Sequence, residues 1–256
     1  MTSVQRILPG MIAVVLFIIG WELYCRISGI SPLILPAPSR ISVVFMQVAL
    51  DPGTLHHAGV TLGETLAGFG LAVVFGVVIG WVIAISPLME RALHPFIVAS
   101  QVVPKVALVP LFVLWFGFGS TSKIFVAAVI AFFPVMVNTA LGLRSVDPGH
   151  SDVFRALRAS LPQRIMLLQI PSALPAILAG MEMAIVLATI GAVVGEYLGG
   201  SEGLGYLTIA TMNAFQTDQL FVLIIILTLM GFFLYLAMAG LKRALVSWSA
   251  DDNRAL

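Results

Sequence analysis

The chain has 256 residues, of which 60% are hydrophobic and only 10% are charged. Soluble domains typically carry about 25% charged residues, so this composition indicates an integral membrane protein. The net charge of +1 gives no support to nucleic acid as a partner. The single cysteine, Cys25, excludes an intramolecular disulfide and cannot make a metal site by itself.

Long apolar runs set the predicted architecture. A helix needs about 20 apolar residues to cross the hydrocarbon, and these runs lack the alternation of membrane strands. We therefore predict an all-α membrane protein with about six transmembrane helices. The first is retained, because no small-residue cleavage site follows it. The spans are expected near residues 8–27, 61–85, 96–118, 122–143, 173–196 and 219–241.

The distribution of lysine and arginine predicts the orientation, because cytoplasmic loops carry an excess of these residues. With both termini in the cytoplasm, most basic residues fall on that side. The cytoplasmic set is Arg6, Arg91, Arg144, Arg155, Arg158, Arg164, Lys242, Arg243 and Arg254, the outer set is Arg26, Arg40 and Lys123, and Lys105 lies inside a span.

The segment after the first span is expected to lie along the outer interface. Prolines at 32, 36 and 38 keep the chain extended, and a short helix follows at about 40–50, too short to span. His56 and His57 are adjacent rather than spaced i, i+4 as a helical metal pair would be, so we predict no metal site there. Glu64 is expected at the outer edge of its span, within reach of water.

Small residues mark two of the spans as packing surfaces. Gly76 and Gly80 form a small-xxx-small pair in the second span, and Gly191 and Gly195 form another in the fifth. Such pairs let helix backbones approach closely in lipid. Either pair is compatible with a contact inside one chain or between two copies.

Polar groups inside the third and fifth spans are candidates for a translocation path. Pro104 and Pro110 interrupt the third span, and broken helices at membrane depth are tolerated where they line a cavity or are buried in protein. Lys105 either snorkels to the cytoplasmic edge or faces a cavity, and its depth favours the cavity. Glu182 either pairs with a loop arginine or lines the path.

Between residues 144 and 172 the apolar sequence gives way to a basic, polar stretch. It is predicted to form two short helices joined at residues 160–162, and a structured cytoplasmic loop of this kind indicates a docking site. The chain has no G-x-x-x-x-G-K-[ST] and no nucleophile or zinc motif. We therefore predict no catalytic, cofactor or metal site. A secondary carrier acting without an ATPase and a non-transporting scaffold remain as alternatives.

Ordered motifs add a family resemblance to this picture. The loop reads DVFRALRAS from Asp152 and, after a spacer, IPSALPAILAG from Ile170. This arrangement resembles the EAA loop of ABC-type import permeases. Three flanking motifs are similar to those of the nitrate/sulfonate/taurine branch, which includes importers of pyrimidine vitamin precursors and aromatic acids. They are LPAPS at 35–39, P-x-x-A-L-x-P-L-x-x-x-W-F-G-x-G-x-x-S-K at 104–123 and G-L-G-Y-L at 203–207.

The resemblance implies a type I ABC importer (MetI-like) permease of the bacterial inner membrane, usually a homodimer. It implies two copies of a separate cytoplasmic ATPase, which binds ATP and magnesium, and a periplasmic or lipid-anchored binding protein. No cofactor is expected in this chain. The ATPase-coupling residues are expected to be Asp152, Val153, Phe154, Arg155, Ala156, Leu157, Arg158, Ala159 and Ser160. The translocation path is expected to include Pro104, Lys105 and Glu182, and the lysine favours a small anionic solute.

Two departures from the family pattern qualify the coupling loop. Residues 152–154 are Asp-Val-Phe where Glu-Ala-Ala is usual, and Arg158 stands at the usual glycine. We expect Asp152 at a helix N-terminus, capped by Ser151, and we expect Arg158 to exclude a positive φ. Phe154 is expected to insert into an apolar ATPase pocket with the two neighbouring arginines at its rim.

The expected organisation has three parts. Residues 1–60 hold the first transmembrane helix and the outer interfacial segment. Residues 61–241 form the permease core and include the coupling loop 144–172. Residues 242–256 form a cytoplasmic tail.

Overall fold

The computed structural model describes residues 3–246, which are almost entirely helical. The first half comprises α1 (Ser3–Ser28), α2 (Pro38–Ala49), α3 (Pro52–Ile85), α4 (Pro87–Val102), a 3₁₀ turn at Lys105–Leu108 and α5 (Val109–Phe116). The second half comprises α6 (Ser120–Arg144), α7 (Pro148–Ala156), α8 (Leu161–Arg164), a π-helical segment at Ile165–Gln169, α9 (Ile170–Gly199), α10 (Leu204–Asn213) and α11 (Thr217–Leu245). Most of the predicted tail, Arg254 included, lies outside the described residues.

Within residues 3–246, five helical stretches are long and apolar enough to cross a membrane. They are Leu8–Ser28, Pro52–Ile85, Ser120–Arg144, Leu161–Gly199 and Thr217–Leu245. The prediction of a single span at 96–118 is wrong, because α4 ends at Val102 and only a short apolar helix, Lys105–Phe116, follows. Pro104 is the cause: it pushes the preceding residue out of the helical region, and Val103 is extended (φ −64°, ψ 125°).

The core of the molecule is built on α6, which packs against α3 on one side and α9 on the other. The residues between these helices are mostly small, so the backbones approach closely as they do in membrane helix pairs. This core consists of Ala72, Ala127, Ala131, Val135, Ala184, Ala188 and Ala192, all of which are buried.

The small-residue pairs belong to this core. A Cβ on Gly80 would lie 2.5 Å from the Met136 carbonyl oxygen, and one on Gly76 would lie 2.8 Å from the Cβ of Val135. A Cβ on Gly191 would lie 2.7 Å from the Cα of Ala127. Both pairs therefore make contacts within one chain, of the two possibilities that the sequence left open.

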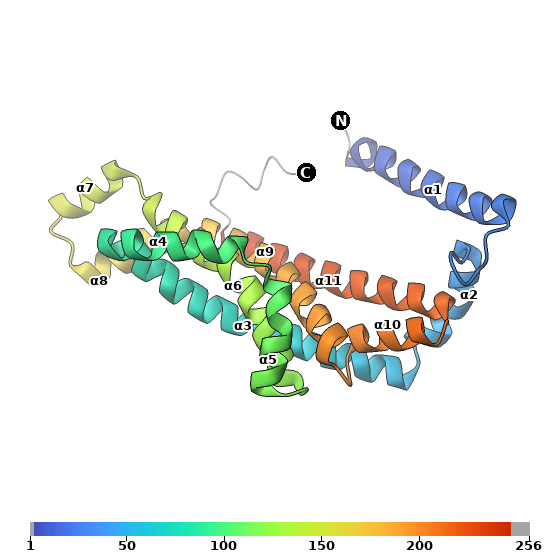
Figure 1. Cartoon of the computed structure of the whole chain (residues 1–256). Helices are drawn as coiled ribbons and strands as arrows, with labels where there is room; N and C mark the ends of the chain where they lie inside the picture. Colours follow the sequence, from blue (N-terminus) through green and yellow to red (C-terminus); the bar gives the residue numbers. More distant parts are fainter. Residues whose placement is uncertain (1–2, 247–256) are drawn as a thin grey trace.

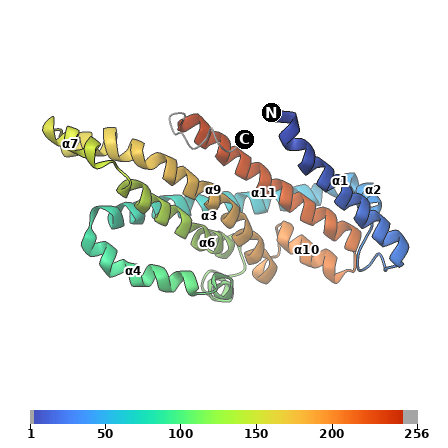
Figure 2. The ribbon, with the colours of Figure 1, turned by 90° about the horizontal axis from the view of Figure 1, so that it is seen from above.

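The long helices α3, α6, α9 and α11 run roughly along one direction (Figure 1). We call the end that carries α7 and α8 the loop end, and the opposite end, with α2 and α10, the far end; Figure 2 shows the same separation. α5 stands across this direction, and Figure 2 views it nearly end-on. α1 lies apart from the body and meets it near its C-terminal end, where the ring centroid of Trp21 is 5.7 Å from that of Phe221.

Candidate functional site

The helix α7 begins earlier than the sequence indicated. Pro148 is its first residue and Asp147 is its N-cap, since an Asp147 oxygen accepts a hydrogen bond from the Gly149 N–H at 2.6 Å. The expectation that Asp152 is capped by Ser151 at the N-terminus is therefore wrong. Asp152 lies in the second turn, where it forms an exposed ion pair with Arg155 at 3.3 Å.

The end of α7 overturns the expectation for Arg158. This residue has a φ of +52°, and it occupies the position after the C-cap that usually holds glycine. The Ala159 N–H donates to the Phe154 carbonyl at 3.0 Å, and the Arg158 N–H donates to the Arg155 carbonyl at 3.0 Å. These two bonds define a Schellman motif, so the loop keeps the glycine conformation without the glycine.

Beyond this turn α8 begins the long apolar stretch Leu161–Gly199. The two predicted short helices are present, but their junction is at residues 157–160 rather than at 160–162. Ser160 caps α8, and its N–H donates to the Gln163 side-chain oxygen at 2.8 Å. A π-helical segment, which is often a functional element, then joins α8 to α9.

The loop presents apolar side chains to its surroundings. Phe154 is half-buried, whereas several aliphatic side chains between residues 153 and 167 are more than half exposed. The exposed set is Val153, Leu157, Leu161, Met166 and Leu167. Val153 and Leu157 lie outside the apolar stretches named above, and exposed apolar side chains on a basic, polar element are typical of a protein contact.

Lys105 lies at the break between α4 and α5. It is half-buried, and its Nζ lies 4.9 Å from the ring centroid of Phe133 on α6, within the range of a cation–π contact. Phe133 also packs against its neighbour Phe132, with ring centroids 5.1 Å apart. The break thus places one cation against an aromatic ring of α6.

Glu182 has a different partner from the one considered in the sequence. Its Oε2 accepts a hydrogen bond from the Lys242 Nζ at 3.2 Å, and both side chains are mostly covered. The loop arginine Arg144 pairs instead with Glu90 and donates to the Ile83 carbonyl at 2.8 Å. Glu182 therefore ties α9 to the end of α11, while its place on the path remains a prediction.

A buried polar cluster at the far end was missed in the sequence. Glu64, Lys123 and Glu196 come from α3, α6 and α9, and each is at most 3% exposed. Lys123 Nζ lies 3.4 Å from Glu64 Oε1. The expectations that Glu64 reaches water and that Lys123 belongs to an outer segment are wrong. Each residue sits in its own span in the sequence, and no local pattern there signals that the three meet.

The cluster holds the glycine-rich turn between α9 and α10. Three successive backbone N–H groups of this turn donate into the cluster and its surroundings. The Gly203 N–H donates to His57 Nδ1 at 3.0 Å, the Leu204 N–H to Thr61 Oγ1 at 2.7 Å and the Gly205 N–H to Glu196 Oε2 at 2.6 Å. Lys123 Nζ donates to the Glu202 carbonyl at 3.4 Å. The turn is thus fixed to all three core helices.

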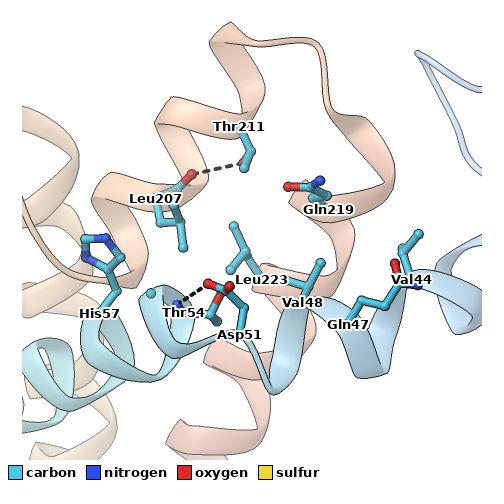
Figure 3. A pocket seen from close by; sticks show the side chains of 11 residues that line it. Val44, Gln47, Val48, Asp51, Thr54, His57, Leu207, Thr211, Gln219 and Leu223 are labelled. Carbon is cyan, nitrogen blue, oxygen red and sulfur yellow. Dashed lines mark hydrogen bonds between the residues drawn. The ribbon is translucent and has the colours of Figure 1, made fainter.

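A pocket of about 400 Å³ opens beside this cluster (Figure 3). It lies between α2, α3, α10 and α11, with Gln47 and Gln219 on one side and His57 on the other. His57 therefore borders both the pocket and the turn. Among the described residues, no group of three or more His, Cys, Asp or Glu side chains is placed to hold a metal ion.

Comparison with known proteins adds to this geometry. A family model described as "Binding-protein-dependent transport system inner membrane component" matches residues 72–248. The chain is 37% identical over 247 residues to the formylaminopyrimidine transport permease protein ThiX of Halalkalibacterium halodurans, covering 96% of this chain and 97% of that protein. It is 37% identical over 241 residues to the riboflavin transport system permease protein RibX of Chloroflexus aurantiacus, covering 94% and 90%.

More distant relatives include the taurine transport system permease protein TauC of Escherichia coli, which is 29% identical over 247 residues and covered to 89%. Among solved structures, a chain of the inward-facing MetNI methionine ABC transporter matches with a TM-score of 0.66. That match covers 75% of this chain and 95% of the other at 16% identity, so it concerns the fold alone.

Proposed function

This chain belongs to the family of binding-protein-dependent transport system inner membrane components, and from that premise we propose that two copies of it form the path of an importer. It is a multi-pass permease subunit of the bacterial inner membrane, and ATP hydrolysis belongs to a separate subunit. The family acts together with an ATPase and a substrate-binding protein. The findings give no support to a carrier that works without an ATPase.

The loop end is the proposed face for the ATPase. Its support is the exposure of Val153 and Leu157 on and next to α7, the helix that carries the half-buried Phe154 and projects from the body (Figure 1). Arg155 and Arg158 belong to the same loop, and their charge supports the proposal that the loop end faces the cytoplasm. We propose that Phe154 and its aliphatic neighbours enter an apolar pocket of the ATPase, with residues 152–160 as the coupling segment.

The test of this coupling site is Phe154→Asp in the complex with its ATPase, assayed in lipid. A buried carboxylate without a partner is costly, so we expect loss of solute-stimulated ATP hydrolysis and of transport. His150→Asp is the matched control, since it adds a carboxylate at an exposed position of the first turn of α7. Normal coupling by the Phe154 variant in an assembled complex would reject the proposed contact.

The proposed substrate is a small solute with a planar nitrogen heterocycle. The two relatives at 37% identity are named for formylaminopyrimidine and riboflavin, both of which contain such a ring system. The Phe133 ring beside Lys105 is compatible with stacking on a flat ring. The positive charge of Lys105 favours anions, so sulfonates and nitrate form a second candidate class.

Uptake measurements distinguish these classes. Cells with the complete importer are offered pyrimidines, flavins, aliphatic sulfonates and nitrate, each as a labelled solute. Lys105→Met is expected to reduce uptake of the transported solute about 10-fold, as loss of one charge-assisted contact predicts. Lys105→Arg retains the charge and should keep most of the uptake. Unchanged rates in Lys105→Met would assign the lysine a structural role.

A further inference from the structure

The cluster at the far end has one more acidic group than basic group. Glu64 and Glu196 share the single ammonium group of Lys123, and all three side chains are at most 3% exposed. A buried charge without compensation is strongly unfavourable, and in practice the group becomes neutral instead. The cluster is therefore short of one positive charge.

Among the residues that the structure describes, those surrounding the cluster do not supply this charge. His57 Nδ1 accepts the Gly203 N–H at 3.0 Å, so this nitrogen carries no proton and the ring is neutral. His56 lies 4.0 Å from Glu202, and both side chains are more than half exposed. The titratable groups nearby are His56 and His57 on α3, Lys123 on α6, Tyr197 on α9, Glu202 in the turn and Tyr206 on α10.

The carboxyl groups of Glu64 and Glu196 differ in the hydrogen-bond donors that surround them. Glu196 Oε1 accepts from the Thr61 hydroxyl at 2.7 Å, and Oε2 accepts from the Gly205 N–H at 2.6 Å, which suits the ionised form. Glu64 lies 3.4 Å from Lys123 Nζ and also interacts with Ser120 and Glu196. Neither Glu64 oxygen has a hydrogen bond of normal geometry among the described residues.

We propose that Glu64 and Glu196 share one proton, which resides mainly on the Glu64 carboxyl group. This shared proton links α3 to α9 beneath the turn at 200–205. The proton balances the cluster and supplies the one O–H donor that Glu64 can offer a neighbouring carboxylate. Loss of this proton leaves two carboxylates next to one ammonium group and weakens the attachment of the turn to the core helices. This inference goes beyond the proposed transport function and does not depend on it.

Glutamine substitution separates this arrangement from a simple ion pair. Glu64→Gln replaces a protonated acid by a neutral amide of similar shape, so its thermal midpoint in lipid is expected within about 3 °C of the wild type. Lys123→Met removes the only ammonium group and should lower the midpoint by roughly 6 °C or more. Glu182→Gln is the control, because it neutralises the acidic partner of the ion pair with Lys242. Its thermal midpoint shows the effect of this change on an ordinary ion pair. A Glu64→Gln midpoint as low as that of Lys123→Met would overturn the proposal.

Infrared spectra in lipid report on the proton directly. The wild type at neutral pH is expected to show the carbonyl band of a buried protonated carboxyl group, and Glu64→Gln is expected to lack it. Absence of this band from the wild type overturns the proposal even if a variant does not fold.

Two titrations complete the test. Because the unfolded chain releases this proton at neutral pH, the wild-type midpoint should fall as the pH rises, and Glu64→Gln should reduce that slope. If the thermal midpoint of the wild type instead rises with sodium concentration at constant pH, the missing positive charge comes from a metal cation. That result would reject the proposal of a shared proton.

Discussion

At the residue scale, Arg158 adopts a left-handed backbone conformation that residues with a Cβ disfavour, as Phe215 also does. A left-handed conformation costs a residue with a Cβ roughly 1–2 kcal/mol, whereas glycine adopts it freely. Here the two Schellman hydrogen bonds at the end of α7 maintain a φ of +52°. The hydrogen bonds at the C-terminus of α7 therefore determine the backbone geometry of the loop. Arginine at this position adds a positive charge to the loop and lowers the stability of the fold.

Arg158→Gly is accordingly expected to stabilise the protein by about 1 kcal/mol, because the strain at φ +52° disappears. Arg155→Gly, inside α7, should instead destabilise it by about 0.5–1 kcal/mol. Thermal unfolding in lipid measures both. A loss of stability in Arg158→Gly would mean that the arginine side chain makes contacts that outweigh the strain.

At the scale of the elements, the close packing of α3 on α6 depends on glycines of one helix face. Gly80 has no room for a methyl group, since its Cβ would lie 2.5 Å from the Met136 carbonyl oxygen, whereas nothing lies within 4 Å of the corresponding position at Gly70. The same helix thus offers a tight and an open glycine.

Gly80→Ala is expected to destabilise the protein by about 1–3 kcal/mol, because the two backbones must separate. Gly70→Ala should be neutral or stabilising by about 0.5–1 kcal/mol, because alanine favours the helix. Denaturation of both variants in mixed micelles gives the comparison. Equal effects at the two positions would show that close helix approach is not what Gly80 provides.

The elements also show where sequence reasoning succeeds and fails. Five spans follow from apolar length alone, and α2 and the two loop helices follow from proline and polarity. The proposed span at 96–118 failed because Pro104 breaks the hydrogen-bond ladder more completely than its apolar neighbours indicate. The cap at Asp147 was missed because Ser151 is an equally suitable residue type.

At the scale of the whole molecule, α1 stands apart from the core formed by α3, α6 and α9. Its membrane-spanning part, Leu8–Ser28, has no buried residues, and the family match begins only at residue 72. By contrast, the glutamates and the lysine of the far-end cluster come from three separate helices. No spacing in the sequence signals such a meeting, so only the assembled fold brings the cluster into view.

Removal of residues 1–29 is therefore expected to leave the core folded, with a thermal midpoint within about 3 °C of the full chain. Tryptophan fluorescence and proteolysis in lipid measure the outcome, and the control is the full chain prepared in the same way. Loss of a cooperative transition would place α1 within the folding unit.

The interruption at Val103 and Pro104 also has a consequence for how the chain can exist in a bilayer. Lipid tails offer no hydrogen bonds, so backbone that leaves the helix at membrane depth must meet protein or water. On the side of α4 and α5, this chain presents such backbone beside a lysine. In the proposed assembly of two copies, a second copy placed against that side would enclose this backbone and line an aqueous chamber with it.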